Sequence, residues 1–391
     1  MGTGSGSKER TAVIGVGQTK YASTRGDVSM AGLLREAAYR ALEMAGKTWD
    51  DIDAVVMGKA PDFFEGVMMP EIYLAEALGC VGKPIMRVHT AGSVGGSTAC
   101  VAASMVQSRV HQTVLTIAWE KQSESNAMWA LSLPAPFTTS VNAGAGGYFS
   151  PIMRRYMAMS DAPELIGCMV AFKDRQHALK NPFAHLQQKD LTFDQVVESP
   201  MLWDPIRYSE TCPSSDGACA MILTDEAGGD AHDGPVAWIK GTAMRSESNS
   251  YGGRNMVSPR ASEECANDVF AQAGIHDRRK EIDAVEMYVP FSWYEPMWLE
   301  SLGFADKGQG WRMVEDGSTN HEGGDLPVNC SGGVLSTNAI GASGMVRFAE
   351  AALQVMGEAG EHQVDGARTA FGHAYGGGAQ YFAMWVVAAE K

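Results

Sequence analysis

Apolar and polar positions in the first part of the chain follow the order strand, helix, strand. The run TAVIGVG at Thr11–Gly17 is almost wholly apolar and predicts a buried strand. Residues 30–46 carry apolar side chains at helical spacing and end in Ala-Gly, and residues 51–58, DIDAVVMG, predict a second strand. Because this succession with a short return loop is typical of α/β proteins, we expect a buried parallel sheet.

The same pattern recurs late in the chain. Residues 39–57 and 268–287 both run from a helix through Ala-Gly and a polar loop into Ile-Asp-Ala-Val, with Ile52 and Ile282 230 positions apart. A second echo links 92–106 with 338–356, where a turn of small residues opens a long helix at an offset of 245. Two echoes in the same order predict internal duplication. We therefore expect two α/β halves. The halves are 1–235 and 236–391, with an inserted loop domain at about 119–215 that is rich in Pro, Met and Trp.

Composition narrows the class of protein. The chain has 391 residues, of which 45% are hydrophobic and 20% charged, as in soluble globular proteins, and no run of 18 apolar residues predicts a membrane span. A net charge of -15 argues against nucleic-acid binding. Seven scattered cysteines without metal-ligand spacing fit a reducing cytoplasm and indicate no metal site. The first ten residues, MGTGSGSKER, predict a short disordered leader. The chain also has 23 Met residues, which we expect either in the core or around a large apolar pocket.

Four ordered motifs then carry a family resemblance. They are KDRQHALKNPFAHL (173–186), DPIRYSETCPSSDGACAMIL (204–223), LPVNCSGGVLSTNAIGASG (326–344) and AYGGGAQ (374–380). From Thr11 to Val387 the chain resembles the thiolase superfamily, most closely the sterol-carrier-protein thiolases and lipid-transfer proteins. The resemblance implies a five-layer α-β-α-β-α thiolase fold with two pseudo-twofold-related halves. It also implies a homodimer that acts on acyl-CoA thioesters, with no other cofactor.

The resemblance assigns active-site positions that no longer carry thiolase chemistry. A thiolase places its nucleophilic Cys at the N-terminus of a buried helix, where the helix dipole stabilises a thiolate. Here Ser93 takes that position, or Gly92 if the alignment gap falls elsewhere. Asn338 replaces the histidine of the GHPxGATG loop, and Ala374 replaces the second cysteine. Asn cannot take a proton from Ser93, so we disfavour a serine acyl-enzyme and keep a helix N-cap as the alternative role of Ser93.

A fourth altered position is Tyr288, which stands in place of the His of the His-Asp-Cys-Phe turn. It is either a packing residue or a group that moves a proton. Tyr294 and His373 are further candidates, with packing and a satisfied structural histidine as alternatives. The expected oxyanion donors are backbone N–H groups at Gly92, Gly376 and Gly377, together with the Asn338 amide. Cys100 is expected in the core and Cys330 at the border of the site.

The loop motif supplies the expected CoA contacts. Lys173, Arg175, His177 and Lys180 lie in the segment that borders the CoA channel in relatives, and a solvated basic helix face is the alternative. A thioester enzyme without a thiol nucleophile can still perform retro-aldol cleavage, which needs a base, an oxyanion hole and a proton for Cα.

The resemblance therefore favours retro-aldol cleavage of a bulky 3-hydroxyacyl-CoA, such as a sterol side-chain CoA ester. Members of this branch that do so work with a small zinc-ribbon/OB-fold protein and carry a tyrosine at the position of Asn338, where this chain departs. An acyltransferase with an unusual nucleophile and a non-catalytic acyl-CoA or lipid-binding subunit are the alternatives.

Overall fold

The structure is a computed structural model that describes residues 9–60, 62, 64–125, 144–248 and 253–391. Residues 1–8 of the expected ten-residue leader and residues 126–143 of the loop domain lie outside this part of the chain. Within the described residues, no helix is long and apolar enough to cross a membrane.

In the described part of the chain, nine strands form one mixed sheet in the order β3-β2-β4-β7-β1-β8-β11-β10-β9. The strands are β1 (Thr11–Gln18), β2 (Ala54–Gly58), β3 (Ile85–Val88), β4 (Thr113–Lys121), β7 (Asp216–Asp225), β8 (Ala237–Ser246), β9 (Ala284–Glu286), β10 (Thr369–Gly376) and β11 (Tyr381–Ala388). In the first part, β1 is antiparallel to β7, β7 to β4, and β4 is parallel to β2. In the second, β8 is antiparallel to β11, β11 to β10, and β10 is parallel to β9. The two parts thus share one topology.

The expectation of a simple parallel sheet is wrong. Strand β1 does not pair with β2, although the helix between them forms as predicted. Its two neighbours, β7 and β8, both run antiparallel to it. The apolar run Thr11–Gly17 signals burial on both faces of a strand, which a central antiparallel strand shows as readily as a parallel one.

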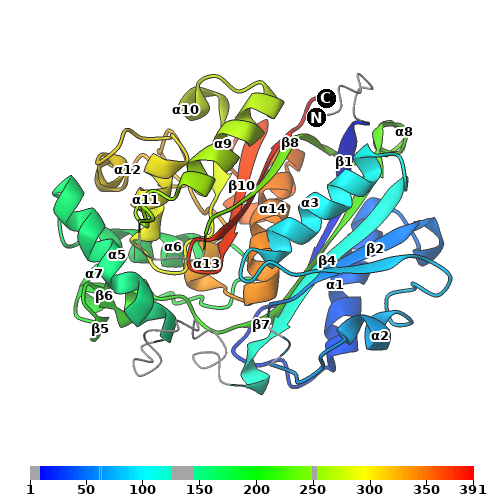
Figure 1. The fold of residues 1–391 in the computed structure, drawn as a ribbon, viewed down its shortest axis with the longest axis horizontal. Helices are drawn as coiled ribbons and strands as arrows, with labels where there is room; N and C mark the ends of the chain where they lie inside the picture. The colour runs from blue at the N-terminus through cyan, green and yellow to red at the C-terminus, as the bar shows by residue number, and fades with distance from the viewer. Residues whose placement is uncertain (1–8, 61, 63, 126–143, 249–252) are drawn as a thin grey trace.

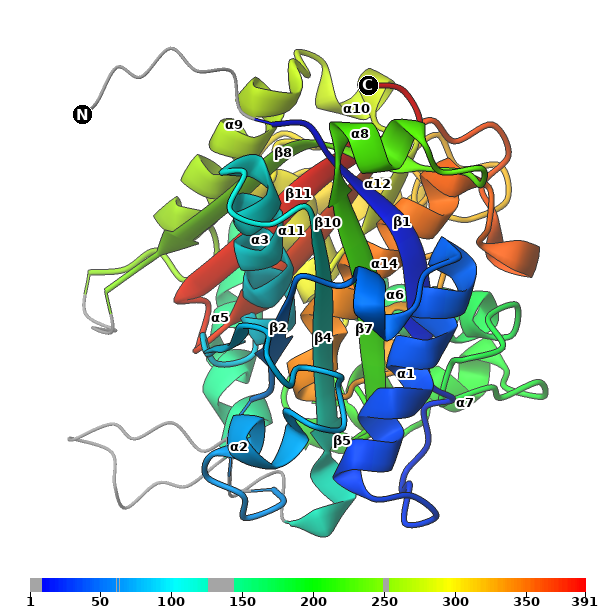
Figure 2. The same ribbon diagram turned by 90° about the vertical axis from the view of Figure 1, so that its right-hand side faces the viewer.

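Helices lie between and outside the two parts of the sheet. The long helices are α1 (Met30–Ala45), α3 (Val94–Gln107), α5 (Gly144–Ser160), α6 (Ile166–Ala178), α9 (Arg260–Ala273) and α14 (Ile340–Met356). Helix α1 covers β1 and β7, α9 covers β8 and β11, and α3 and α14 contact strands of both parts. Figure 1 shows α14 at the centre of the molecule, and Figure 2 shows α1 in front of β4 and β7 with α14 behind them. The layers are those of a thiolase fold.

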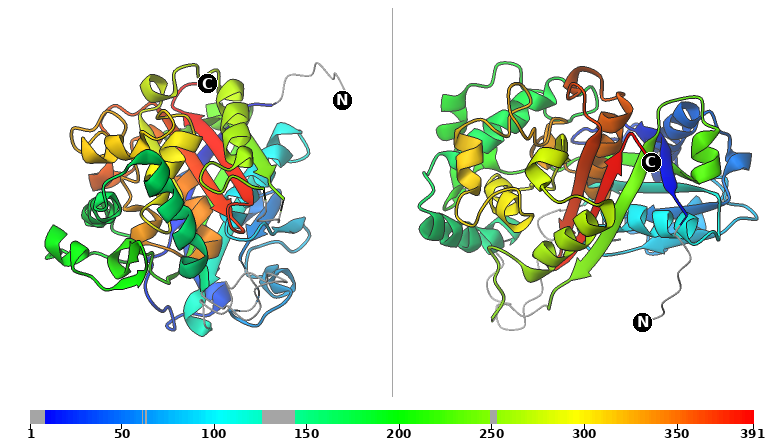
Figure 3. Two further views of the ribbon diagram at one scale, coloured as in Figure 1. Left: turned by 60° about the vertical axis from the view of Figure 1, so that its left-hand side comes forward. Right: turned by 90° about the horizontal axis from the view of Figure 1, so that it is seen from above.

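The remaining elements are short and gather mainly in the loop domain and the second half. They are α2 (Pro70–Leu74), α7 (Phe193–Val197), α8 (Glu226–Asp230), α10 (Arg278–Glu281), α11 (Tyr294–Ser301), α12 (Gly310–Glu315), α13 (Gly333–Ser336) and the hairpin β5 (Met201–Trp203) with β6 (Ile206–Arg207). The loop domain, green in Figure 3, packs beside the yellow segment that carries α11 and α12. It therefore covers one side of the half of the molecule that β9 and β10 build.

Small residues let the two central helices cross closely, as the paired turns in the sequence predict. A Cβ added at Gly95 would lie 2.5 Å from Met345 N and 2.7 Å from Gly341 O. A Cβ added at Gly344 would lie 2.8 Å from Gly96 N. Any side chain at these points would push α3 and α14 apart. The crossing therefore brings the loops before both helices, which carry Gly92 and Asn338, to one place.

Candidate active site

Tyr288 follows β9 and is held from three directions. Its backbone N–H donates to His373 Nδ1 at 3.4 Å, and its carbonyl accepts from Trp298 Nε1 at 3.1 Å. Its hydroxyl donates to Asn338 Oδ1 at 3.4 Å. Burial raises the pKa of Tyr288 well above its usual value, because a phenolate has no water to solvate it there. Tyr288 is therefore a protonated phenol at neutral pH that faces the loop before α14.

Asn338 is fixed by both its backbone and its side chain. Its backbone N–H donates to Ser215 Oγ at 3.1 Å, and its carbonyl accepts from Ser215 N at 3.0 Å and from Gln122 Nε2. Its Oδ1 also accepts from Ser343 Oγ at 3.0 Å, and its Nδ2 donates to Cys212 Sγ at 3.1 Å. The amide therefore stands between a phenol and a thiol with a set orientation.

The position facing Tyr288 across the site is Gly92. A Cβ added at Gly92 would lie 3.8 Å from Tyr288 Oη and 3.3 Å from Tyr375 O. Ser93 is buried, and its Oγ instead donates to Thr90 O at 2.8 Å. Ser93 does occupy the N-cap position of α3, as the alternative held, but its hydroxyl makes no capping hydrogen bond to the helix. Of the two positions left open by the sequence, the structure brings Gly92 into the site and turns the Ser93 side chain away.

Strand β10 presents its side chains to two different environments. Ala374 faces the crossing of the central helices, because a Cβ added at Gly96 or Gly344 would lie 2.6 or 2.8 Å from the Ala374 methyl. Gly376 lies on the same side and approaches the first turn of α3, where its added Cβ would lie 2.5 Å from Gly92 N. Gly377 follows with a left-handed φ of 62°, which turns the chain towards β11. The glycine turn thus abuts the N-terminus of α3.

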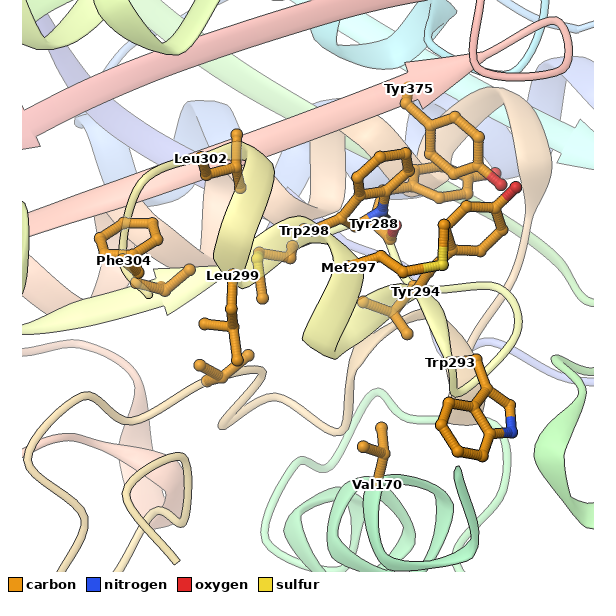
Figure 4. Packing of buried hydrophobic residues seen from close by; sticks show 14 of the residues in the cluster. Val170, Tyr288, Trp293, Tyr294, Met297, Trp298, Leu299, Leu302, Phe304 and Tyr375 are labelled. Carbon is orange, nitrogen blue, oxygen red and sulfur yellow. Dashed lines mark hydrogen bonds between the residues drawn. The ribbon is translucent and has the colours of Figure 1, made fainter. Parts of the chain in front are cut away.

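The other side of β10 joins an aromatic cluster that the sequence did not single out. Tyr375 packs its ring edge-on to Tyr288 at 5.3 Å and also contacts Tyr294 and Trp298, each at 5.2 Å. Figure 4 shows the hydroxyls of Tyr375 and Tyr294 pointing towards each other. Burial raises the pKa of both phenols. Side chains two residues apart on a strand lie on the same face, so the spacing from the candidate His373 could have predicted that Tyr375 lies in the site.

His373 supports Tyr288 from behind. It is fully buried, and its Nδ1 accepts the Tyr288 backbone N–H. Burial lowers the pKa of His373 to about 3, so the ring is neutral over the physiological range. The structure therefore gives His373 a backbone contact and no contact with the Tyr288 hydroxyl.

The cationic residues of the loop motif lie mostly inside the protein. Lys173 forms a buried ion pair with Glu295 at 2.6 Å, and Arg175 donates to the carbonyl of Leu335. His177 is buried too, with its Nδ1 3.1 Å from Asn329 O. These contacts contradict a solvated basic face, because Lys173 and Arg175 both have partners inside the protein.

Lys180 is the partly exposed member of this set. It pairs with Glu322 at 2.5 Å. Together with Lys173 and His177 it lines a cavity of about 770 Å³ between α6 and α12. The expected contacts of Lys173, Arg175 and Lys180 with CoA stay predictions, and Lys173 and Lys180 line the same cavity.

Cys212 is a site residue that the sequence reasoning missed. All seven cysteines are free, and Cys212 is half-buried while Cys100, Cys330 and the others are buried. Its backbone N–H donates to Pro290 O at 2.9 Å, which ties it to the Tyr288 turn. Burial raises the pKa of the Cys212 thiol to about 12, against the opposing charge of Arg175. The site thus holds a thiol at a place unrelated to the two thiolase cysteine positions.

Fold and site together define a thiolase-fold protein whose reactive positions hold a phenol, an amide and a glycine. Residues 243–388 match the family described as "Thiolase C-terminal domain-like". An "Acetyl-CoA acetyltransferase" from Methanothermobacter thermautotrophicus is 31% identical over 384 residues, covering 94% of this chain and 96% of that protein. A "17-hydroxy-3-oxo-4-pregnene-20-carboxyl-CoA lyase" from Mycobacterium tuberculosis is 27% identical over 373 residues, covering 89% of this chain and 92% of that protein.

A solved structure gives the same answer for the fold. The "Ltp2-ChsH2(DUF35) aldolase" matches with a TM-score of 0.84 and 25% sequence identity, covering 98% of this chain and 99% of that chain. The chain belongs to the thiolase superfamily, in its lipid-transfer branch. Thiolase-like action on acyl-CoA esters is the function that these relatives support.

Proposed function

We propose that the protein cleaves a carbon–carbon bond of a bulky 3-hydroxyacyl-CoA by a retro-aldol reaction. The observation that carries the proposal is the meeting of the Tyr288 hydroxyl and the Asn338 amide opposite Gly92. Position 92 carries no side chain, so the two groups face backbone there and no nucleophile. Such a site offers proton transfer and hydrogen bonding without an acyl-enzyme.

The reaction needs a donor set for the enolate oxygen, and the backbone supplies it. The N-terminus of α3 at Gly92 and the turn at Gly376 and Gly377 abut each other, so their N–H groups are candidates for an oxyanion hole. Asn338 adds a donor, because one N–H of its Nδ2 contacts Cys212 and the amide has a second. Tyr288 supplies the proton that Cα takes up.

The relatives support the choice of reaction and substrate class. One of them is called a lyase of a steroid carboxyl-CoA, and the matching structure is called an aldolase. A steroid side-chain CoA ester is therefore the proposed substrate class. The same structure's description pairs the aldolase with a DUF35 component, which supports a small zinc-ribbon/OB-fold protein as the proposed partner.

A homodimer is also part of the proposal. Strand β3 lies at one end of the sheet, and the segment around it exposes apolar side chains to solvent. This edge patch consists of Met68, Met69, Ile72, Tyr73, Val81 and Met86. An exposed apolar sheet edge of this kind pairs readily with another chain, and a second copy is the proposed occupant.

The test is product formation from a CoA ester with a 3-hydroxyl on a branched carbon. Purified protein with its DUF35 partner should release a ketone and a shortened acyl-CoA in equal amounts. Tyr288→Phe keeps the ring and its packing but removes the hydroxyl, and should reduce cleavage by about 100-fold or more. Turnover unchanged in this variant, or no product from a series of such substrates, contradicts the proposal.

Acyl transfer is the second candidate, because the relative at 31% identity is an acetyltransferase and the site does hold one thiol, Cys212. It predicts an acyl-enzyme with the acyl group on sulfur. Intact-protein mass spectrometry under turnover separates the two functions, since retro-aldol cleavage leaves the protein mass unchanged.

A further inference from the structure

Retro-aldol cleavage as proposed above gives Tyr288 one proton transfer and leaves the removal of the 3-hydroxyl proton unassigned. The position of Cys212 makes it a candidate for that role. One amide joins the two groups, because Asn338 Nδ2 donates to Cys212 Sγ at 3.1 Å and Asn338 Oδ1 accepts from Tyr288 Oη at 3.4 Å. Ser343 Oγ also donates to that Oδ1, at 3.0 Å, and helps to hold the amide in this orientation.

The orientation of the Asn338 amide has opposite effects on the acidity of Cys212 and of Tyr288. An N–H directed at sulfur stabilises a thiolate, while a carbonyl that accepts from a phenol stabilises the protonated phenol. Arg175 adds positive charge beside Cys212, since its Nη2 donates to Thr211 O at 3.2 Å. Burial raises the pKa of both groups. An unperturbed thiol is more acidic than an unperturbed phenol, so the hydrogen-bond directions and the charge of Arg175 favour Cys212 as the group of the pair that loses a proton.

We propose that Cys212 is the base that takes the 3-hydroxyl proton and that Tyr288 is the acid that protonates Cα. This inference rests on the proposed function and extends it from one catalytic residue to a pair. It also places a thiol in the reaction as a proton carrier, at a position that differs from both thiolase cysteine positions.

The proton and electron balance closes over one turnover. Cys212 enters the cycle as a thiolate, after its proton has passed to solvent. The thiolate takes the hydroxyl proton, the O–H electron pair forms the carbonyl of the leaving ketone, and the Cα–Cβ bond breaks. Its electron pair moves into the thioester as an enolate. Tyr288 then gives its proton to Cα and becomes a phenolate, which recovers a proton from the Cys212 thiol. No oxidant, reductant or further reactant takes part.

The experiment compares two reactions of the same complex. The first is cleavage of a 3-hydroxyacyl-CoA. The second is deuterium exchange at Cα of a saturated acyl-CoA in D₂O, followed by NMR. In this reaction a Tyr288 phenolate, formed by loss of its proton to solvent, removes and returns the Cα proton, and no hydroxyl needs a base. Cys212→Ala should lower cleavage by about 100-fold or more and leave exchange within about tenfold of wild type, while Tyr288→Phe should lower both.

Two control variants test whether the loss of cleavage comes from the loss of the Cys212 thiol. Cys212→Ser retains a small polar group but not an acidic one, so its cleavage should stay low. Cys80→Ser removes a buried thiol that packs in a different apolar cluster from Tyr288 and should leave both reactions unchanged. Exchange that falls together with cleavage in Cys212→Ala overturns the inference, as does full cleavage in that variant or an acyl group on Cys212. Wild-type protein that neither cleaves nor exchanges instead overturns the proposed function itself.

Discussion

A cysteine placed at position 92 or at position 93 should behave in two different ways. Gly92 has no left-handed φ, so a side chain is allowed there, and its added Cβ meets Tyr375 O at 3.3 Å. That contact is tight and should cost about 1 kcal/mol in the free energy of unfolding of Gly92→Cys. Ser93→Cys loses the hydroxyl bond to Thr90 O, which is also worth about 1 kcal/mol. Both variants should therefore fold, with similar stability.

Thiol labelling then reports which position faces the substrate. The two variants are labelled with iodoacetamide and followed by peptide mass spectrometry, with and without a saturated acyl-CoA. At a ligand concentration ten times Kd, the thiol of Gly92→Cys should be protected about tenfold, since only the free fraction reacts. Ser93→Cys should show no protection, because its side chain points to Thr90. Protection of the thiol in Ser93→Cys but not in Gly92→Cys refutes the assignment of Gly92 to the site.

Three further predictions concern the fold, a buried ion pair and the assembly. Gly95→Ala forces a methyl to within 2.5 Å of Met345 N and should lower the free energy of unfolding by about 1–3 kcal/mol, measured by urea denaturation; an unchanged midpoint argues against the close helix crossing. The buried pair of His362 and Glu350, 2.8 Å apart, raises the pKa of His362 and lowers that of Glu350. The raised pKa of His362 stabilises the fold fully below the unfolded His pKa of about 6.5, and this stabilisation is lost as pH rises through the folded pKa of His362. The lowered pKa of Glu350 stabilises the fold above about pH 4.5, and this stabilisation is lost as pH falls through the folded pKa of Glu350. The stability lost in His362→Gln should therefore be largest between these limits and smaller above pH 7, and a pH-independent difference contradicts the ion pair. Ile72→Asp places a charge in the edge patch and should convert a dimer into monomers by light scattering, whereas an unchanged mass speaks against that surface.

Local patterns predicted the elements and the crossing of the central helices. Helix α1 begins after Ser29, whose Oγ accepts from Gly32 N at 3.1 Å, and ends at Gly46 with a left-handed φ of 60°. Small-residue turns at an offset of 245 marked α3 and α14, because only small residues permit their close contact. Strand direction could not be predicted in the same way, since a continuous apolar run reports burial and carries no information about its neighbours.

The sequence predicted site residues only at positions that match the reactive positions of the family it resembles. Tyr288 and Asn338 lie together as the resemblance implies, but the choice between Gly92 and Ser93 depends on the side-chain direction at a helix start. Tyr375 and Cys212 were missed because they come from other parts of the chain and meet Tyr288 only through the fold. A solvated face was the wrong alternative for Lys173 and Arg175, because charged residues in a helix usually face solvent, whereas here their partners lie on α11 and α13.

The central claim is that a thiolase scaffold here performs enolate chemistry without an acyl-enzyme. The most direct test is cleavage of a 3-hydroxyacyl-CoA in D₂O by the wild-type complex, with mass spectrometry of both the shortened acyl-CoA and the protein. The account predicts one deuterium at Cα of the product, delivered from Tyr288, and an unmodified protein mass throughout turnover. An unlabelled product, or an acyl group carried on the protein during turnover, contradicts it.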